Sequence, residues 1–275
     1  MDILQEIVAW KKKEVEQEKT LVPPSRLYAL VEQIMEQQGA RRSMRQALCE
    51  SHSGIIAEFK RKSPSKGWIH QDARPEDVVT AYQRGGASAA SILTDEKYFG
   101  GSMDFVRTVR PLVDIPLLRK EFIIDEYQLF QAKAIGADAV LLIAADLQKR
   151  VCESLVHTAR QLQLEVLLEL HGEDELDYAC CEPDMVGVNN RHLGTFVTDV
   201  RHSLAMARCL PAGQVWVSES GIGSAQTVAT LREAGYRGFL MGEHFMRHPD
   251  PGAALMQFVS EVEGSITCLP SPQSP

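Results

Sequence analysis

Residues Ile55–Gly67 read IIAEFKRKSPSKG, and the first six letters follow the pattern of a β-strand. Apolar side chains recur there with a period of two, which is how a strand places them on one face. Glu58 and Lys60 fall on the other face, which points inward if the strand is buried on both sides. Buried carboxylates and ammonium groups are unfavourable unless they are paired or used in chemistry. Two interpretations stay open at this point: an exposed edge strand with a solvated ion pair, or charged groups at an active site.

The strand continues into a loop whose residues can bind an anion. Ser63, Ser65 and Lys66 stand beside Pro64 and Gly67, so hydroxyls, backbone amides and an ammonium group are close in sequence. A short motif of this kind is a hypothesis that depends on its structural context. The loop predicts an anion site beside the charged pair.

Seven more apolar runs follow, separated by helix-like segments. The runs cover residues 87–93, 115–120, 137–143, 164–170, 184–190, 214–219 and 237–242, and the clearest helical patterns cover 76–84, 125–135, 147–162 and 225–234. Such alternation indicates a parallel sheet covered by helices. Eight units in about 220 residues favour an α/β fold of the (β/α)8 barrel type over an open sheet. A dinucleotide-binding sheet is disfavoured, because Gln226 stands where the third glycine after Gly221 and Gly223 belongs.

The chain before the first strand is predicted to be a helical extension. Ile3, Ile7 and Trp10 share one face of a helix over residues 2–18, which we expect to pack on the body of the protein rather than on a membrane. A second apolar stripe follows over residues 27–35. The predicted organisation is one domain, with the extension over residues 1–50, the barrel over 55–264 and a flexible tail over 265–275.

The composition excludes several classes of partner. Hydrophobic residues make up 44% of the chain, and 29 basic against 37 acidic side chains give a net charge of −8. An acidic surface disfavours nucleic acid and anionic membranes as partners. No apolar run approaches the ~20 residues of a membrane span. The first residues also lack the pattern of a signal peptide, so we expect a cytoplasmic protein.

Cysteines and histidines do not predict a metal site. The six cysteines form no C-x-x-C pair, which indicates free thiols in a reducing compartment. His244 and His248 are four residues apart, as zinc ligands on a helix are, but the adjacent Pro249 argues against a long regular helix there. We therefore expect no metal.

Charged residues recur at the ends of the predicted strands. In a barrel the carboxyl ends of the strands form the active-site face, so these side chains converge there; they are Glu58, Lys60, Lys120, Glu169 and Glu219. Each alone has a plain structural explanation, such as a solvated Lys120 or an ion pair between Glu169 and Arg191. Together they favour a cleft suited to general acid–base chemistry, since carboxylates keep a partly buried lysine protonated. A lysine Schiff base is less favoured, because the same carboxylates disfavour the free amine.

The last two strands carry a second anion signal. Ser-Glu-Ser-Gly-Ile-Gly follows the seventh strand and Met-Gly-Glu-His the eighth. Small residues let backbone amides approach a ligand, and the loops after strands seven and eight of barrels are frequent phosphate sites. The alternative is a pair of plain tight turns.

Taken together, these segments resemble the indole-3-glycerol phosphate synthase family. The resemblance covers nearly the whole length and rests on IIAEFKRKSPSKG, SILTDEKYFGGS, LLRKEFIID, LLELH, GVNNRHL and SESGI. It implies a carboxy-lyase of tryptophan biosynthesis that needs no cofactor or metal. The implied reaction converts 1-(2-carboxyphenylamino)-1-deoxyribulose 5-phosphate to indole-3-glycerol phosphate, carbon dioxide and water.

The resemblance also implies roles for individual residues. Lys120 resembles the general acid, Glu169 and Glu58 resemble the carboxylates that transfer protons, and the implied catalytic set is completed by Lys60, Asn189 and Ser220. Lys60 resembles a lysine that steers the substrate carboxylate. The implied substrate-binding residues are Ser63, Phe99, Phe122, Arg191, Leu193, Glu219, Gly221, Gly242 and Glu243. The resemblance implies that Phe99, Phe122 and Leu193 form an apolar wall. It implies that the phosphate is contacted by Ser63, Gly221, Gly242 and Glu243.

Two positions depart from the family pattern. His192 stands where aspartate is common, and we expect its side chain to face away from the site. Glu243 stands where serine or threonine is common, and its carboxylate would repel a phosphate. We therefore expect Glu243 to offer only its backbone amide and to point outward; an inward carboxylate would put phosphate binding in doubt.

Two other functions remain as alternatives. A phosphosugar isomerase of the same barrel group would share the phosphate loops but would not need both Lys60 and Lys120 beside Glu169. A non-catalytic barrel would have lost one of these charged residues, and all are present. We expect a monomer, with weak association with other enzymes of the tryptophan pathway and with no nucleic-acid or membrane partner.

Overall fold

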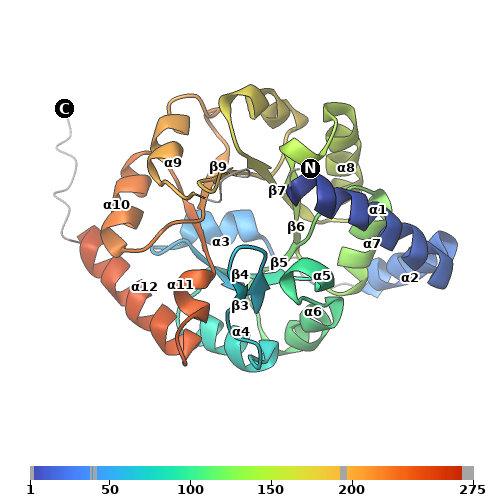
Figure 1. The fold of residues 1–275 in the computed structure, drawn as a ribbon, viewed down its shortest axis with the longest axis horizontal. Helices are drawn as coiled ribbons and strands as arrows, with labels where there is room; N and C mark the ends of the chain where they lie inside the picture. Colours follow the sequence, from blue (N-terminus) through green and yellow to red (C-terminus); the bar gives the residue numbers. More distant parts are fainter. Residues whose placement is uncertain (1–2, 38, 40–41, 193–196, 268–275) are drawn as a thin grey trace.

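Eight parallel strands close into a barrel (Figure 1), as the alternation of the sequence predicts. The computed structural model describes residues 3–37, 39, 42–192 and 197–267. The strands follow one another around the barrel in chain order, and β1 closes it by pairing with both β4 and β10. Their bounds are β1 Ile55–Phe59, β4 Ala89–Leu93, β5 Leu117–Lys120, β6 Ala139–Ile143, β7 Glu165–Leu170, β8 Met185–Asn189, β9 Val215–Glu219 and β10 Gly238–Met241.

Helices surround the barrel and precede it. The predicted helical segments are confirmed, while the segment between β7 and β8 is a 3-10 helix. The bounds are α1 Ile3–Leu21, α2 Pro24–Gln37, α3 Met44–Glu50, α4 Pro75–Arg84, α5 Glu96–Phe99, α6 Met103–Val109, η1 Arg110–Leu112, α7 Glu126–Ala134, η2 Ala144–Asp146, α8 Lys149–Gln161, η3 Glu173–Cys181, α9 Arg201–Met206, α10 Ala225–Glu233, α11 Glu243–Met246 and α12 Pro251–Thr267.

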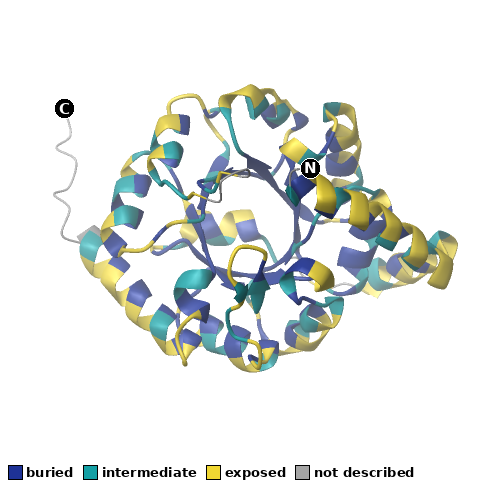
Figure 2. Ribbon diagram, in the orientation of Figure 1, coloured by how far each residue is buried: buried dark blue, intermediate teal, exposed yellow. Residues whose placement is uncertain are grey.

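The strands are buried on both faces, and the helices are buried on their inner faces (Figure 2). Alternate strand residues build two hydrophobic layers, one inside the barrel and one between the strands and the helices. In β1, Ile55 and Ala57 belong to the outer layer, whereas Ile56 belongs to the interior. Glu58 follows Ile56 by two residues and is also buried. The inward direction predicted for Glu58 is confirmed.

Helix α3, which the sequence patterns did not reveal, closes the amino-terminal end of the barrel. Met44 and Leu48 are fully buried and pack with the interior layer. Ser43 caps the helix by accepting a hydrogen bond from the backbone N–H of Gln46. Because this end is filled by apolar side chains, the opposite end holds the open cavity.

Helix α1 packs on the barrel through a buried lysine as well as through apolar side chains. The buried residues of α1 are Leu4, Ile7, Lys11 and Val15. The prediction for Trp10 was wrong: 37% of it is exposed, and Lys97 Nζ lies 3.8 Å from the centre of its ring. Lys11 belongs to the buried face of α1 because carboxylates surround its ammonium group.

The Lys11 ammonium joins the extension to the loops after β4 and β5. Its Nζ lies 3.0 Å from both Asp95 Oδ2 and Glu121 Oε1, and it also bonds Glu14. Burial lowers the pKa of Lys11, but the carboxylates of Glu121 and Asp95 outweigh burial and raise it above its ordinary value. The lysine is therefore charged inside the protein.

We expect Lys11→Met to destabilise the fold by about 3 kcal/mol, because it leaves the buried carboxylates of Asp95 and Glu121 without the cation that they share. Urea unfolding followed by circular dichroism measures this loss. The exposed Lys12 provides the matched control, and Lys12→Met should change the free energy of unfolding by less than about 0.5 kcal/mol. Equal stabilities of the two variants would contradict the anchoring role.

Candidate active site

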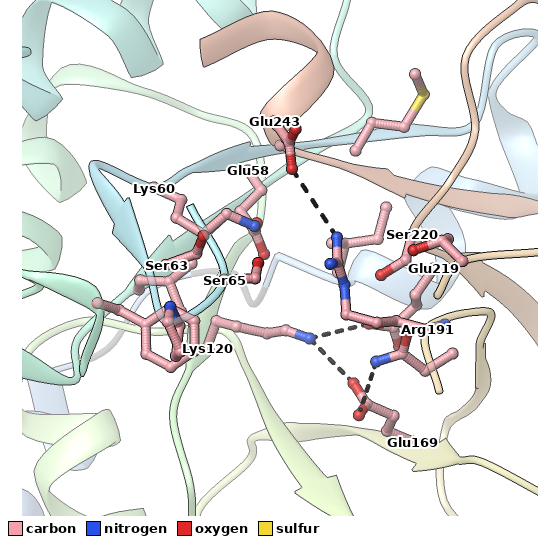
Figure 3. Close-up of a pocket in the computed structure, with 18 of the residues that line it drawn as sticks. Glu58, Lys60, Ser63, Ser65, Lys120, Glu169, Arg191, Glu219, Ser220 and Glu243 are labelled. Carbon is pink, nitrogen blue, oxygen red and sulfur yellow. Dashed lines mark hydrogen bonds and ion pairs between the residues drawn. The ribbon is translucent and has the colours of Figure 1, made fainter. Parts of the chain in front are cut away.

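The cavity at the carboxyl ends of the strands has a volume of about 540 Å³ (Figure 3). Among the described residues, all of the predicted site residues line it: Glu58, Lys60, Ser63, Phe99, Lys120, Phe122, Glu169, Asn189, Arg191, Glu219, Ser220, Gly221, Gly242 and Glu243. Leu193 lies outside the described residues. Ile3, Leu4 and Ile7 of α1 form part of the wall, so the extension contributes directly to the cavity.

Lys120 connects two carboxyl groups at the centre of the cavity. It is the last residue of β5, and its Nζ donates to Glu169 Oε2 at 3.1 Å and to Glu219 Oε2 at 2.9 Å. Figure 3 shows the lysine reaching across from its strand toward both acids. Burial lowers the pKa of Lys120, but Glu169 and Glu219 outweigh it and raise the pKa above the ordinary value. The site therefore holds an ammonium group that can donate a proton in a water-poor environment.

The two acids differ in their affinity for protons. Burial alone would raise the pKa of Glu169, but Lys120 and His171 hold it down at about 2. Burial raises the pKa of Glu219 to about 8, because Lys120 offsets only part of the burial effect and the charge of Glu169 adds to it. The opposite directions of the two shifts indicate that Glu169 stays ionised and that Glu219 is the acid of the pair that takes up a proton near neutral pH.

Asn189 and Gly187 hold this cluster in place from β8. The Asn189 side chain donates from Nδ2 to Glu169 Oε1 at 3.1 Å. A Cβ atom added to Gly187 would lie 2.3 Å from Glu219 Oε1, so only glycine leaves room for that carboxyl group. The neighbouring strands therefore fix the orientation of both acids.

Glu58 and Lys60 form a second charged pair in the same cavity. Lys60 Nζ donates to Glu58 Oε1 at 2.5 Å, and the glutamate is buried. A Cβ atom added to Gly242 would lie 2.4 Å from Glu58 Oε1. Gly242 thus provides the space that the buried Glu58 needs, in addition to any contact with a ligand.

The Ser63–Gly67 segment forms a short antiparallel hairpin where an open loop was predicted. Strands β2 Lys62–Ser63 and β3 Gly67–Trp68 pair over the edge of the cavity, and Gly67 takes a left-handed conformation with φ of 68°. The Ser63 hydroxyl is buried and has no protein partner among the described residues. A polar group left in this state inside a cavity is available to a ligand.

The prediction that Glu243 points outward was wrong. Its carboxylate lines the cavity and lies 3.9 Å from both Lys66 Nζ and an Arg191 guanidinium nitrogen. Figure 3 shows the carboxylate directed at Arg191. The two nearby cations explain the inward direction, and they offset the negative charge that would otherwise disfavour a phosphate in this part of the cavity. His192, by contrast, is exposed and does not line the cavity, as predicted.

Aromatic side chains form the apolar wall. The ring centroids of Phe99 and Phe122 lie 6.0 Å apart with an angle of 36° between the planes. Leu141 and Ile143 of β6 and Leu240 of β10 also line the cavity. The site therefore combines an apolar wall with a set of buried charged groups.

Comparisons with known proteins agree with this geometry. A sequence model of the family described as "Indole-3-glycerol phosphate synthase" matches residues 4–258. A protein with that name from Bacteroides thetaiotaomicron is 55% identical over 262 residues, which cover 95% of this chain and 99% of the relative. One from Carboxydothermus hydrogenoformans is 41% identical, with 92% and 97% covered.

The chain belongs to the indole-3-glycerol phosphate synthase family.

Solved structures at low identity show the barrel fold alone. The chain is similar to 3-hexulose-6-phosphate synthase, with a TM-score of 0.61 at 14% identity and coverage of 77% of this chain and 99% of that one. It is similar to thiamine phosphate pyrophosphorylase from Pyrococcus furiosus, with a TM-score of 0.60 at 17% identity and coverage of 81% and 98%. Within the described ranges, no helix has the length and apolar character needed to cross a bilayer.

Sequence reasoning missed several residues that line the cavity of this family member. They include His171, Thr198 and Arg247. His171 had a usable signal, because it follows Glu169 by two residues and so extends the same face of β7. His244 also lines the cavity; its ring lies 6.3 Å from that of His248, and the described residues contain no cluster of three or more His, Cys, Asp or Glu side chains able to hold a metal.

Proposed function

We propose that Lys120, Glu169, Glu58 and Lys60 carry out the acid–base steps of the family reaction in this cavity. The reaction closes the ring of 1-(2-carboxyphenylamino)-1-deoxyribulose 5-phosphate and releases carbon dioxide and water, leaving indole-3-glycerol phosphate. The observation that carries the proposal is the Lys120 ammonium held at 3.1 and 2.9 Å from two buried acids. A proton donor fixed in this way suits attack on a ketone.

The first step needs an acid. The aryl carbon that bears the carboxylate attacks the ketone carbon, and Lys120 gives a proton to the ketone oxygen as the new bond forms. Loss of carbon dioxide then returns the bonding electron pair to the ring. In the last step the hydroxyl group takes a proton and leaves as water, while a carboxylate removes a carbon-bound proton. We assign these later transfers to Glu169, Glu58 and Lys60, whose charged groups share the cavity.

The remaining residues hold the substrate. Lys60 steers the substrate carboxylate, while Asn189 and Ser220 complete the polar wall. Phe99 and Phe122 contact the aromatic ring, a role that we also propose for Leu193. The phosphate contacts Ser63, Gly221, Gly242 and the backbone amide of Glu243; the buried Ser63 hydroxyl that lacks a protein partner among the described residues supports this placement.

We expect Glu243→Ser to tighten the binding of inorganic phosphate about threefold, because it removes a carboxylate that competes for Lys66 and Arg191. Calorimetric titration with phosphate measures the change. Glu233→Ser, at an exposed position on α10, removes the same charge far from the cavity and should leave the affinity unchanged. Weaker binding by Glu243→Ser would contradict the competition.

A fluorescence assay tests the proposed function. The purified chain should convert the synthetic anthranilate-deoxyribulose phosphate to the fluorescent indole product with no added cofactor. A protein that is folded but forms no product would overturn the proposal and return the isomerase alternative to consideration.

The cellular setting is also a proposal. The cysteines that the structure describes are all free, which suits a reducing cytoplasm. The contact of α1 with the cavity supports treating residues 1–50 and the barrel as one domain. We further propose that the enzyme acts as a monomer, in weak association with other enzymes of the pathway.

A further inference from the structure

The proposed reaction consumes a proton that the substrate does not supply. The substrate carboxylate leaves as neutral carbon dioxide, so the ketone oxygen must gain a proton from outside. The second proton, given to the departing hydroxyl, is balanced by the carbon-bound proton that a carboxylate removes. Each turnover therefore takes up one solvent proton, and that proton must reach Lys120.

The central acid–base groups have little access to solvent. The side chains of Glu169 and Glu219 are 5% and 1% exposed, and that of Lys120 is 14% exposed. A bound substrate would cover the cavity side of these groups further. The solvent proton thus needs a route through the wall.

His171 follows the end of β7 and lies beside Glu169 in the wall of the cavity. Its Nε2 lies 3.2 Å from Glu169 Oε1, and its side chain is 11% exposed. Both ring nitrogens are buried and, within the part of the chain that is described, have no aligned hydrogen-bond partner. An imidazole can accept a proton on one nitrogen and release one from the other. No step proposed above uses this ring.

Acidic side chains at the start of η3 follow His171 in the chain. Its backbone N–H donates to Glu175 Oε2 at 2.6 Å, at the start of η3. Burial raises the pKa of the half-buried Glu175, so this carboxyl takes up protons more readily than a free one. Asp174 also lies beside this turn. On the inner side, the other groups on Glu169 are Asn189 at Oε1 and Lys120 at Oε2.

We propose that His171 is a positioning residue that orients Glu169 and passes it the solvent proton consumed in each turnover. The inference rests on the proposed function. A proton binds Nδ1, the proton on Nε2 moves to Glu169 Oε1, and Glu169 restores the proton that Lys120 has given to the ketone oxygen. Solvent then removes the proton from Nδ1 and supplies one to Nε2, which returns the ring to its starting tautomer. No proton or electron is left over.

Replacement by glutamine and by alanine tests the relay. His171→Gln keeps an amide donor near Glu169 but cannot pass a proton, so we expect kcat to fall about tenfold or more with KM within about twofold. The same variant should lose a limb of the kcat–pH profile. His171→Ala should lose similar activity and regain part of it when millimolar imidazole is added. His157→Gln, on the exposed face of α8, is the matched control and should equal the parent enzyme.

The possible outcomes separate the two proposals. If His171→Gln has the kcat and the pH profile of the parent enzyme, the relay is overturned and the proposed function stands. Loss in His171→Ala without rescue, accompanied by a raised KM and a lowered melting temperature in both variants, assigns His171 a structural role and also overturns the relay. No product from the parent enzyme overturns the proposed function instead. His171→Asn provides a second non-titrating variant if His171→Gln fails to fold.

Discussion

Lys120→Met should lower kcat by about a thousandfold or more, because it removes the proton donor and the charge that stabilises the developing alkoxide. Methionine has nearly the length of lysine and fills the same space without an ammonium group. Product fluorescence in single-turnover conditions measures the loss. The change should appear in kcat rather than in affinity, since the proposed phosphate contacts lie on other loops.

The fold should survive this substitution. Removing Lys120 leaves Glu169 and Glu219 without their shared cation, but both can then take up protons and become neutral. Lys149→Met, at an ion pair with Asp177 on the outside of the barrel, serves as the control and should retain full activity. Circular dichroism and phosphate titration check folding and binding. Near-normal product formation by Lys120→Met would refute the role assigned to this lysine.

Much of the architecture could be predicted because barrel strands leave a simple pattern. A strand buried on both faces reads as a short apolar run, and all eight runs became strands of the barrel. Once the strands are placed, their final residues fall at one end. Lys120 and Glu169 could therefore be assigned to a common cavity although they are distant in sequence.

The errors arose where neighbours distant in sequence decide the outcome. Trp10 was predicted to share the packed face of the first helix, yet acids after β4 and β5 make a buried position favourable for Lys11 and leave Trp10 partly exposed. The Glu243 carboxylate was expected to point outward, with only the backbone amide at the anion site, but the cations Lys66 and Arg191 lie beside the carboxylate inside the cavity. Patterns along the chain record each residue's own preference and do not contain these pairings.

The different protonation of Glu169 and Glu219 predicts the second large effect of a substitution on kcat. Glu169 is ionised at neutral pH, whereas Glu219, with a pKa of about 8, carries a proton. Glutamine has the shape of a protonated glutamate and lacks the negative charge. Glu169→Gln therefore removes a working carboxylate, and we expect kcat to fall about a hundredfold to a thousandfold. Glu219→Gln imitates the protonated group that is already present, so we expect kcat to fall by no more than about tenfold.

The two substitutions are matched in size, burial and contact with Lys120, so their ratio reports protonation rather than packing. Measurement at several pH values sharpens the test. Above about pH 8 the parent Glu219 loses its proton while the glutamine variant cannot, so the activities of the parent enzyme and Glu219→Gln should diverge there. A larger loss in Glu219→Gln than in Glu169→Gln at neutral pH would reverse the assignment and make Glu219 the ionised acid beside Lys120.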